Sequence, residues 1–294
     1  MFIPPYRIAL SGGGLKGVAH IGALEVLSER GMLKSLREYV GISAGALVAF
    51  CLSIGSSLPE LRMIISLLDF GLIRDLDAES MLSFPMTFGL DSGANLEKFL
   101  KTILKARSLS STITFKQLDE LRLGPKLRVI VMNLNTCRPQ EFSVECSPST
   151  EVVCAVRASM SIPIYFSPVL EPASNHLLSD GGIYFPSPFK FLSEDERKHT
   201  LSIAFNDSHK QKKDIKTLDD FLYQLYYSLD YETAKELKEE WGHRIMYIDC
   251  GLVNIVKFEA GQEEKLALME SGRRSAEEFL RKLPAKPARR FSIG

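Results

Sequence analysis

The sequence predicts an α/β fold with a mostly parallel sheet, and most of the evidence for this fold lies in the N-terminal part of the chain. An apolar run at residues 7–10, with proline before it and glycine after it, is typical of a buried strand. Apolar residues then recur with helical spacing over 17–31, and a second strand at 39–42 leads at once into a helix over 44–54. Strands and helices that alternate in this order indicate a parallel sheet, because parallel strands need a crossover connection.

The later helices follow from apolar periodicity and from capping residues. Thr114 is a candidate N-cap for a helix over 115–121. Ser147 as N-cap, with Pro148 in the first helical position, predicts another helix that ends near residue 159. Periodicity predicts further helices over 59–70, 96–104, 218–241 and 262–283. The stretch 71–91 fits no regular element, and we expect it to be irregular.

The later strands are short apolar runs between turn residues. A turn at Cys137-Arg138-Pro139 is expected to join strands over 127–134 and 141–144. The remaining candidate strands cover residues 165–170, 176–179, 201–205 and 244–250. Because no repeat or linker interrupts the chain before residue 284, we expect one domain over 1–283 and a basic, flexible tail over 284–294.

Composition and charge exclude several classes of protein. Lysine and arginine together number 36, as do aspartate and glutamate, so the formal net charge is zero. This balance argues against nucleic acid as a partner, because a nucleic-acid binder normally carries a basic excess. Hydrophobic residues make up 45% of the chain and charged residues 24%, which provides enough apolar surface for a core and argues against disorder.

Cysteine usage and hydropathy favour a cytoplasmic protein. The five cysteines have irregular spacing and form no Cys-x-x-Cys pair, a pattern that fits reduced thiols and offers no zinc site. The N-terminus lacks the charged and apolar regions of a signal peptide. The most apolar stretch, 44–54, is about half of the ~20 residues that a membrane span needs, so we expect it to be a buried helix.

The strongest chemical motif is Gly41-Ile42-Ser43-Ala44-Gly45, between a predicted strand and a predicted helix. G-x-S-x-G in this context predicts a nucleophile elbow, in which the flanking glycines let strand and helix approach closely. The serine hydroxyl then lies at a helix N-terminus, where the helix dipole favours negative charge. A plain glycine-rich turn is the alternative.

A second motif, Gly12-Gly13-Gly14-Leu15-Lys16-Gly17, follows the first strand and opens the first helix. Consecutive glycines expose backbone N–H groups that can converge on an oxyanion. The same glycines satisfy G-x-G-x-x-G of dinucleotide-binding proteins, but that fingerprint needs an acidic residue at the end of the second strand, where Ser43 stands instead. A Walker loop is excluded by the order of lysine and glycine, so the oxyanion interpretation is favoured.

A third motif, Ser179-Asp180-Gly181-Gly182, follows the strand predicted at 176–179. An aspartate at a strand end before two glycines is well placed to face a functional site. By itself this pattern is also typical of an ordinary turn. Its value comes from its combination with the other two motifs.

Together these motifs resemble the patatin-like phospholipases, and the resemblance covers nearly the whole chain. Further similar blocks are 89–93 with 96–100, an A-x-R-A-S block at 155–163 followed by Phe166 and Pro168, and 249–252. The resemblance implies a three-layer sandwich with a mostly parallel central sheet flanked by helices and the elbow after the second strand. It also implies a lipid acyl hydrolase of the phospholipase A type, which needs no metal or other cofactor.

The resemblance implies a Ser–Asp dyad in which Ser43 is the nucleophile and Asp180 is the base. It assigns the oxyanion hole to Gly12, Gly13, Gly14 and Ala44. The supporting motif positions are Lys16, Gly17, Gly41, Gly45, Gly181 and Gly182. The sequence independently disfavours a triad, because Ser43 follows a single β-α unit and the later histidines lie in no motif. A carboxylate with a pKa of ~4 is a poor base for serine in water, so the dyad needs a dry site.

For His20, Lys16 and residues 71–91, the sequence allows two interpretations each. We expect His20 to pack or hydrogen-bond in the first helical turn, with substrate contact as the alternative. Lys16 is either a cation for an anionic headgroup or oxyanion, or a solvent-facing residue. The apolar side chains of 71–91, including Phe84 and Phe88, form either an interfacial lip or lid for transient peripheral membrane contact, or ordinary core. The charged loop 210–213 is expected to be solvated.

The motifs fix the reaction and not the lipid headgroup. A neutral-lipid lipase, a lysophospholipase and a general esterase are therefore alternatives to a phospholipase. A catalytically silent lipid-binding protein is the alternative from another class, and a dinucleotide-binding oxidoreductase comes third.

Overall fold

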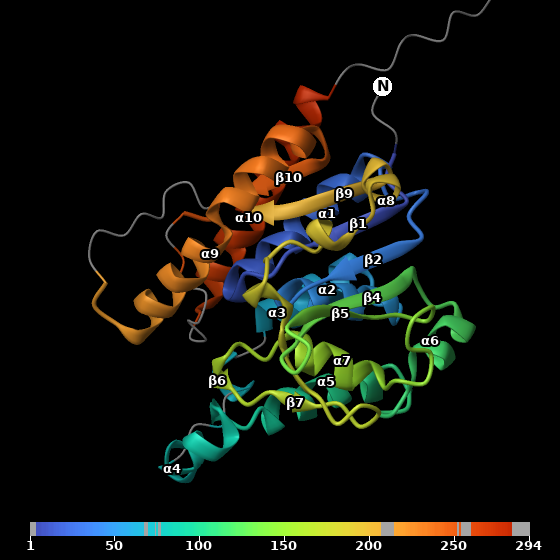
Figure 1. Ribbon diagram of the computed structural model, residues 1–294. Coiled ribbons are helices and arrows are strands. Elements are labelled where there is room, and N and C mark those ends of the chain that lie inside the picture. Colours follow the sequence, from blue (N-terminus) through green and yellow to red (C-terminus); the bar gives the residue numbers. More distant parts are fainter. Residues whose placement is uncertain are drawn as a thin grey trace, which may run out of the picture.

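The computed structural model describes residues 4–67, 70–73, 75, 78–206, 215–251, 253 and 260–283. Its centre is an eight-stranded mixed sheet with the order β10-β9-β1-β2-β4-β8-β7, and β5 pairs with β4 beside this path (Figure 1). The strands are β1 (Arg7–Leu10), β2 (Glu38–Gly41), β4 (Lys126–Asn133), β5 (Arg138–Phe142), β7 (Val169–Leu170), β8 (Leu177–Asp180), β9 (Thr200–Phe205) and β10 (Ile245–Ile248).

The central ladders of this sheet are parallel. The pairs β10–β9, β9–β1, β1–β2 and β2–β4 are parallel, whereas β5, β8 and β7 are joined in antiparallel fashion. The carboxyl ends of β1 and β2 therefore lie side by side, with the glycine loop and the elbow directly after them. The prediction of a mostly parallel sheet flanked by helices, with the elbow after the second strand, is confirmed.

Helices cover both faces of the sheet. Their bounds are α1 (Ala19–Glu29), α2 (Ala44–Ser53), α3 (Leu58–Leu67), α4 (Ala78–Thr87), α5 (Ala94–Ala106), α6 (Phe115–Leu121), α7 (Val152–Ser159), α8 (Glu194–Lys198), α9 (Leu218–Trp241) and α10 (Gln262–Lys282). Along β1, Ile8 and Leu10 belong to a core shared with α1, α2, α7 and α10, whereas Ala9 belongs to a second core with α9. This alternation with period two fills both faces of the sheet.

The first core includes a close crossing of α1 and α10. A Cβ atom at Gly22 would lie 1.8 Å from the carbonyl oxygen of Met269, and one at Gly272 would lie 2.0 Å from that of Ala19. The two helix backbones therefore touch, and α1 is held firmly behind the glycine loop that precedes it.

The prediction that residues 71–91 are irregular is wrong. This stretch contains a 3₁₀ turn η2 (Phe70–Ile73), helix α4, and strand β3 (Gly89–Asp91), which pairs in parallel with β6 (Ile164–Phe166). Pro85 lies inside α4. Proline normally breaks helices, so the sequence carries no clear helix signal here.

The helix expected to begin at Ser147 begins later. The Ser147 hydroxyl accepts a hydrogen bond from the N–H of Ser143 at 3.1 Å, and Thr150 N–H donates to Ser147 O, so these residues form a turn. Helix α7 then starts at Val152. The Ser-Pro pair therefore marks a turn here rather than a helix start, because the serine hydroxyl is used by the preceding segment.

Other boundaries differ by a few residues or split an element. The expected strand 165–170 is two strands, β6 and β7, and β5 begins at Arg138, inside the predicted turn. The first helix opens with a 3₁₀ segment η1 (Gly14–Val18). Sequence analysis missed α8, η3 (Gly181–Ile183), η4 (Pro188–Phe191) and η5 (Gly242–Arg244). The tail 284–294 and the loop 210–213 lie outside the described residues.

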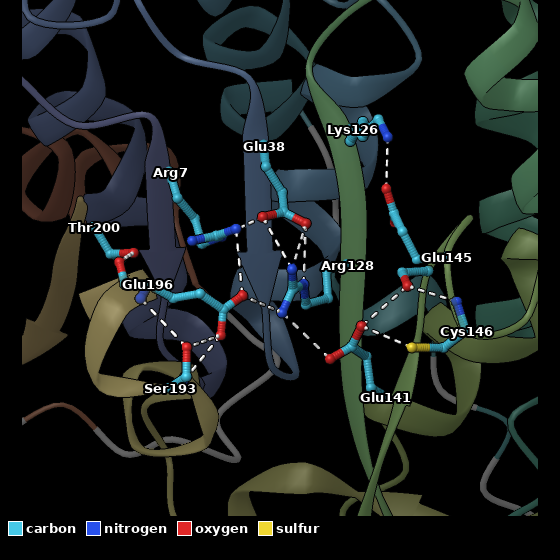
Figure 2. A network of polar contacts seen from close by, with 11 residues as sticks. Arg7, Glu38, Lys126, Arg128, Glu141, Glu145, Cys146, Ser193, Glu196 and Thr200 are labelled. Atoms are coloured by element: carbon cyan, nitrogen blue, oxygen red, sulfur yellow. Dashed lines mark hydrogen bonds and ion pairs between the residues drawn. The ribbon is translucent and has the colours of Figure 1, made fainter. Parts of the chain in front are cut away.

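A partly buried ionic network ties β1, β2 and β4 together near their amino ends (Figure 2). Arg128 of β4 contacts Glu38 of β2 at 3.0 Å, Glu196 of α8 at 2.9 Å and Glu141 of β5 at 3.3 Å. Arg7, the first residue of β1, also pairs with Glu38. The network lies at the opposite end of these strands from Ser43. It is therefore separate from the carboxyl edge of the sheet, where the predicted site residues lie.

Candidate active site

The elbow has the geometry that its motif predicts. Ser43 lies between β2 and α2 with φ 52° and ψ −123°, a conformation that L residues rarely adopt. A Cβ atom at Gly45 would lie 2.1 Å from the carbonyl oxygen of Leu10, and one at Gly41 would lie 2.5 Å from the Cα of Ala46. Both glycines are therefore required because backbone occupies the space of any side chain, and the plain-turn alternative does not account for this strained serine.

Asp180, the last residue of β8, lies beside the elbow because β2 and β8 pair with the same edge of β4. On this edge β2 ends with Gly41 opposite Val129 and β8 ends with Asp180 opposite Val131, whereas β5 pairs with the other edge. The Ser43 side chain lies close enough to the Asp180 carboxylate to help stabilise its charge, and Gly182 N–H donates a hydrogen bond to Asp180 Oδ1 at 2.7 Å. The structure thus brings together two residues that are far apart in the sequence.

The pair is almost dry, with Ser43 exposed by 6% and Asp180 by 5%. Burial raises the pKa of Asp180 from 3.8 to about 7, although the Ser43 side chain and the hydrogen bond from Gly182 lower it. A carboxylate with a pKa near 7 is a better base at neutral pH than an exposed aspartate. The dry site that sequence analysis required is present.

The two glycines after Asp180 allow this close packing. A Cβ atom at Gly181 would lie 2.7 Å from the carbonyl oxygen of Ile130, and one at Gly182 would lie 3.0 Å from Asp180 Oδ1. The Asp-Gly-Gly motif therefore packs closely beside Ile130 and Val131 of β4.

The glycine loop lies beside the elbow, and its residues have different roles. The N–H of Gly12 donates to the carbonyl oxygen of Pro186 at 2.8 Å, so the expectation that Gly12 is an oxyanion donor is wrong for this conformation. Gly12 instead makes room, because a Cβ there would lie 3.2 Å from the Cβ of Ser43. At Gly17, a Cβ would lie 2.5 Å from that of Ala44, so this glycine lets the loop pack on the start of α2.

Three N–H groups remain as candidate oxyanion donors. In the part of the chain that the structure describes, the N–H groups of Gly13, Gly14 and Ala44 donate no hydrogen bond. Gly14 has φ +53°, a left-handed conformation that glycine adopts without strain. Ala44 is the first residue of α2, where the helix leaves its N–H without an internal acceptor.

His20 and Lys16 support the loop from within. His20 is fully buried, its Nε2 donates to the carbonyl oxygen of Ser11 at 2.9 Å, and its ring lies 4.8 Å from that of Phe205. Burial lowers its pKa to about 4, so it is neutral. The packing and hydrogen-bonding role predicted for His20 is confirmed. Lys16 is only 2% exposed, so the solvent-facing interpretation of this residue is wrong.

The remaining histidines form no part of this site. His176 contacts Asn133, His199 stacks on Tyr6, and His243 stacks on Trp241. Among the histidines that the structure describes, none contacts Ser43 or Asp180; His209 lies outside the described residues.

The block 155–163 was recognised from the sequence only by its similarity to the family. The roles of its polar residues were not predicted. The Arg157 guanidinium is buried and donates to the carbonyl oxygens of Gly93 at 3.2 Å and Ser167 at 3.2 Å. It thereby joins the blocks 89–93 and 155–168. Ser159 accepts a hydrogen bond from the backbone of Ser43 at 3.0 Å. The signal that the sequence offered for these roles was an arginine and a serine within a short, mostly apolar motif.

No helix within the described residues is both long and apolar enough to cross a membrane.

The chain is similar in sequence to known proteins. It is 32% identical to "Probable lipid hydrolase 463L" of Invertebrate iridescent virus 6, over 70% of this chain and 66% of that protein, just under two thirds of its length. It is 27% identical to "Uncharacterized protein YqhO" of Bacillus subtilis, over 92% of this chain and 96% of that one.

Solved structures share the fold at low sequence identity. VipD from Legionella pneumophila has a TM-score of 0.63 and 17% identity, with 95% of this chain and 67% of VipD covered. ExoU from Pseudomonas aeruginosa, in complex with SpcU, has a TM-score of 0.54 and 21% identity, with 95% and 52% covered. Residues 8–192, more than half of the chain, match the family model for patatin-like phospholipase. This chain belongs to the patatin-like phospholipase family.

Proposed function

We propose that the protein hydrolyses fatty-acyl esters of phospholipids by phospholipase A chemistry, with Ser43 as nucleophile and Asp180 as base. One observation carries the proposal: Ser43, at a strained elbow, lies beside the buried carboxylate of Asp180. The family supplies the lipid substrate class. The relative from the iridescent virus bears the name of a lipid hydrolase.

In the first half of the reaction, Ser43 Oγ attacks the ester carbonyl while its proton moves to Asp180. The carbonyl oxygen becomes an oxyanion that the N–H groups of Gly13, Gly14 and Ala44 can receive. Collapse of this intermediate breaks the ester C–O bond, and Asp180 returns the proton to the departing lysophospholipid. The acyl group is left on Ser43.

In the second half, a water molecule attacks the acyl-enzyme. Asp180 takes a proton from this water, and the same donors receive the second oxyanion. The fatty acid leaves, the proton passes from Asp180 to Ser43 Oγ, and the starting state returns. Ser43 and Asp180 carry out every proton transfer in this scheme.

Helix α4 is the candidate for contact with the membrane. It projects from the body of the molecule (Figure 1), and Leu82 and Met86, one helical turn apart, are 84% and 83% exposed. Leu72 and Phe88 are also exposed, and residues 80–90 contain no charged side chain. Exposed apolar side chains on an uncharged segment favour the interfacial lip over ordinary core packing.

The test is mass spectrometry of the products formed from mixed phospholipid vesicles with EDTA present, comparing wild type with Ser43→Ala. Free fatty acid and lysophospholipid from wild type alone support the proposal and reveal the acyl position. Products from triacylglycerol or lysophospholipid alone would indicate the other esterases. No product from any lipid, together with no labelling by a fluorophosphonate, would indicate a lipid-binding protein.

A further inference from the structure

We propose that Ser159, at the end of α7, is a positioning residue that holds Ser43 in its reactive conformation; the proposal rests on the proposed function. The backbone N–H of Ser43 donates to Ser159 Oγ at 3.0 Å, across 116 positions of sequence. Ser159 Oγ in turn donates to the carbonyl oxygen of Ile130 at 2.7 Å. Because its single proton goes to Ile130, Ser159 faces Ser43 as an acceptor only.

The hydrogen bond acts at the most strained point of the elbow. Ser43 has φ 52° and ψ −123°, so the backbone needs external contacts to keep this conformation. Its N–H lies before α2 and makes no bond to a backbone carbonyl within the described residues. Ser159 Oγ therefore satisfies a buried donor that would otherwise be left without a partner.

The same short segment also holds the other half of the pair. Asp180 N–H donates to the carbonyl oxygen of Ser161 at 3.0 Å, and Ser179 Oγ donates to it at 2.7 Å. Arg157 fixes this segment through the hydroxyl of Ser161 at 2.5 Å. Residues 159 and 161 thus set the distance between nucleophile and base from one rigid turn.

Ser159 has no exposed surface and cannot touch a substrate. Its loss should therefore lower kcat and leave KM unchanged, because it changes how often Ser43 is aimed at Asp180 and not how lipid binds. A purely structural role would lower the amount of folded protein without changing the rate per folded molecule.

Ser143→Ala is a matched control for Ser159→Ala. Both hydroxyls are fully buried, and like Ser159 Oγ the Ser143 hydroxyl accepts a backbone N–H, that of Cys146 at 3.2 Å, and donates to one oxygen, that of Glu141 at 3.0 Å. The hydrogen bonds of the Ser143 side chain reach neither Ser43 nor Asp180. The two variants should lose similar stability, and only Ser159→Ala should disturb the dyad.

The experiment measures hydrolysis and the rate of fluorophosphonate labelling of Ser43, both corrected for the folded fraction. We expect Ser159→Ala to lower kcat and the labelling rate at least about tenfold with KM within about twofold, and Ser143→Ala to stay within about threefold of wild type. If Ser159→Ala does not fold, Ser159→Cys replaces it, because a thiol keeps most of the volume but accepts hydrogen bonds weakly.

Equal losses in the serine variants at 159 and 143, or unchanged labelling of the variant at 159, would overturn this proposal, while activity of the wild type would uphold the proposed function. Wild type that neither labels nor hydrolyses lipid would overturn both.

Discussion

Asp180 should make the stability of the folded protein fall with rising pH. Its pKa is 3.8 as an ordinary carboxyl group and about 7 in the folded state. Below ~3.8 the group is protonated in both states and has no differential effect. Between these values the unfolded chain ionises while the folded protein keeps the proton, so each pH unit lowers the free energy of unfolding by about 1.4 kcal/mol. Above ~7 both states are ionised, and the accumulated loss of about 4 kcal/mol remains constant.

Asp180→Asn removes this titration and keeps the shape of the side chain. We would measure urea unfolding of wild type and variant at several pH values between about 5 and about 8. The variant should gain stability relative to wild type as the pH rises towards ~7, and the difference should then level off. Glu120→Gln, which removes an exposed carboxylate on α6, should give a curve parallel to that of wild type.

In the proposed mechanism, the same proton controls the reaction. Asp180 can accept the Ser43 proton only when ionised, so the labelling rate of wild type should rise about tenfold per pH unit below ~7 and then level off. A stability difference that does not change with pH, together with a flat labelling rate, would refute the argument that burial holds a proton on Asp180. Loss of labelling in Asp180→Asn, with folding intact, completes the test.

Three further predictions concern other parts of the molecule. Gly45→Ala should abolish labelling of the elbow serine or prevent folding, because the new Cβ would lie 2.1 Å from a backbone oxygen that cannot move away; normal labelling by a folded variant would contradict this. Met86→Asp should weaken sedimentation with phospholipid vesicles without changing the melting temperature, whereas Leu121→Asp, at another exposed site, on α6, should leave sedimentation unchanged; equal binding by both would exclude α4 as the lip. Arg128→Met should cost about 1.5–3 kcal/mol of stability, because Glu38 loses its hydrogen bonds to Arg128 but keeps its ion pair with Arg7, and urea unfolding measures this. Labelling per folded molecule should stay at the wild-type rate, since this network lies at the far end of the strands.

Features fixed by local sterics could be predicted from the sequence. Gly41 and Gly45 sit where any side chain would meet backbone, so G-x-S-x-G carried its own geometry. The capping box at Thr114 is equally local, because the cap and Gln117 are three residues apart. The prediction failed at Ser147, whose hydroxyl had two local uses, and at α4, whose proline hid the helix.

Features fixed by contacts between distant segments could not be predicted. The N–H of Gly12 donates its hydrogen bond to the carbonyl oxygen of Pro186. Only the pairing of β1 with β9 and the η4 turn bring Pro186 beside it. Lys16 is buried although it stands at a helix start. The pKa of Asp180 depends on how completely the surrounding elements exclude water, and no motif encodes that burial.

The chemistry of the dyad and its stability oppose each other. Within the described residues, the Asp180 carboxylate accepts a hydrogen bond from Gly182 N–H, and the nearby Ser43 side chain also lowers its pKa. Additional donors would stabilise the ionised carboxylate and the folded state at neutral pH, but they would also lower its pKa and make it a weaker base. A carboxylate that replaces histidine as the base must therefore stay poorly solvated. The rigidity needed to keep it so must come from groups that avoid its oxygens, as the carbonyl of Ser161 does by binding the Asp180 N–H.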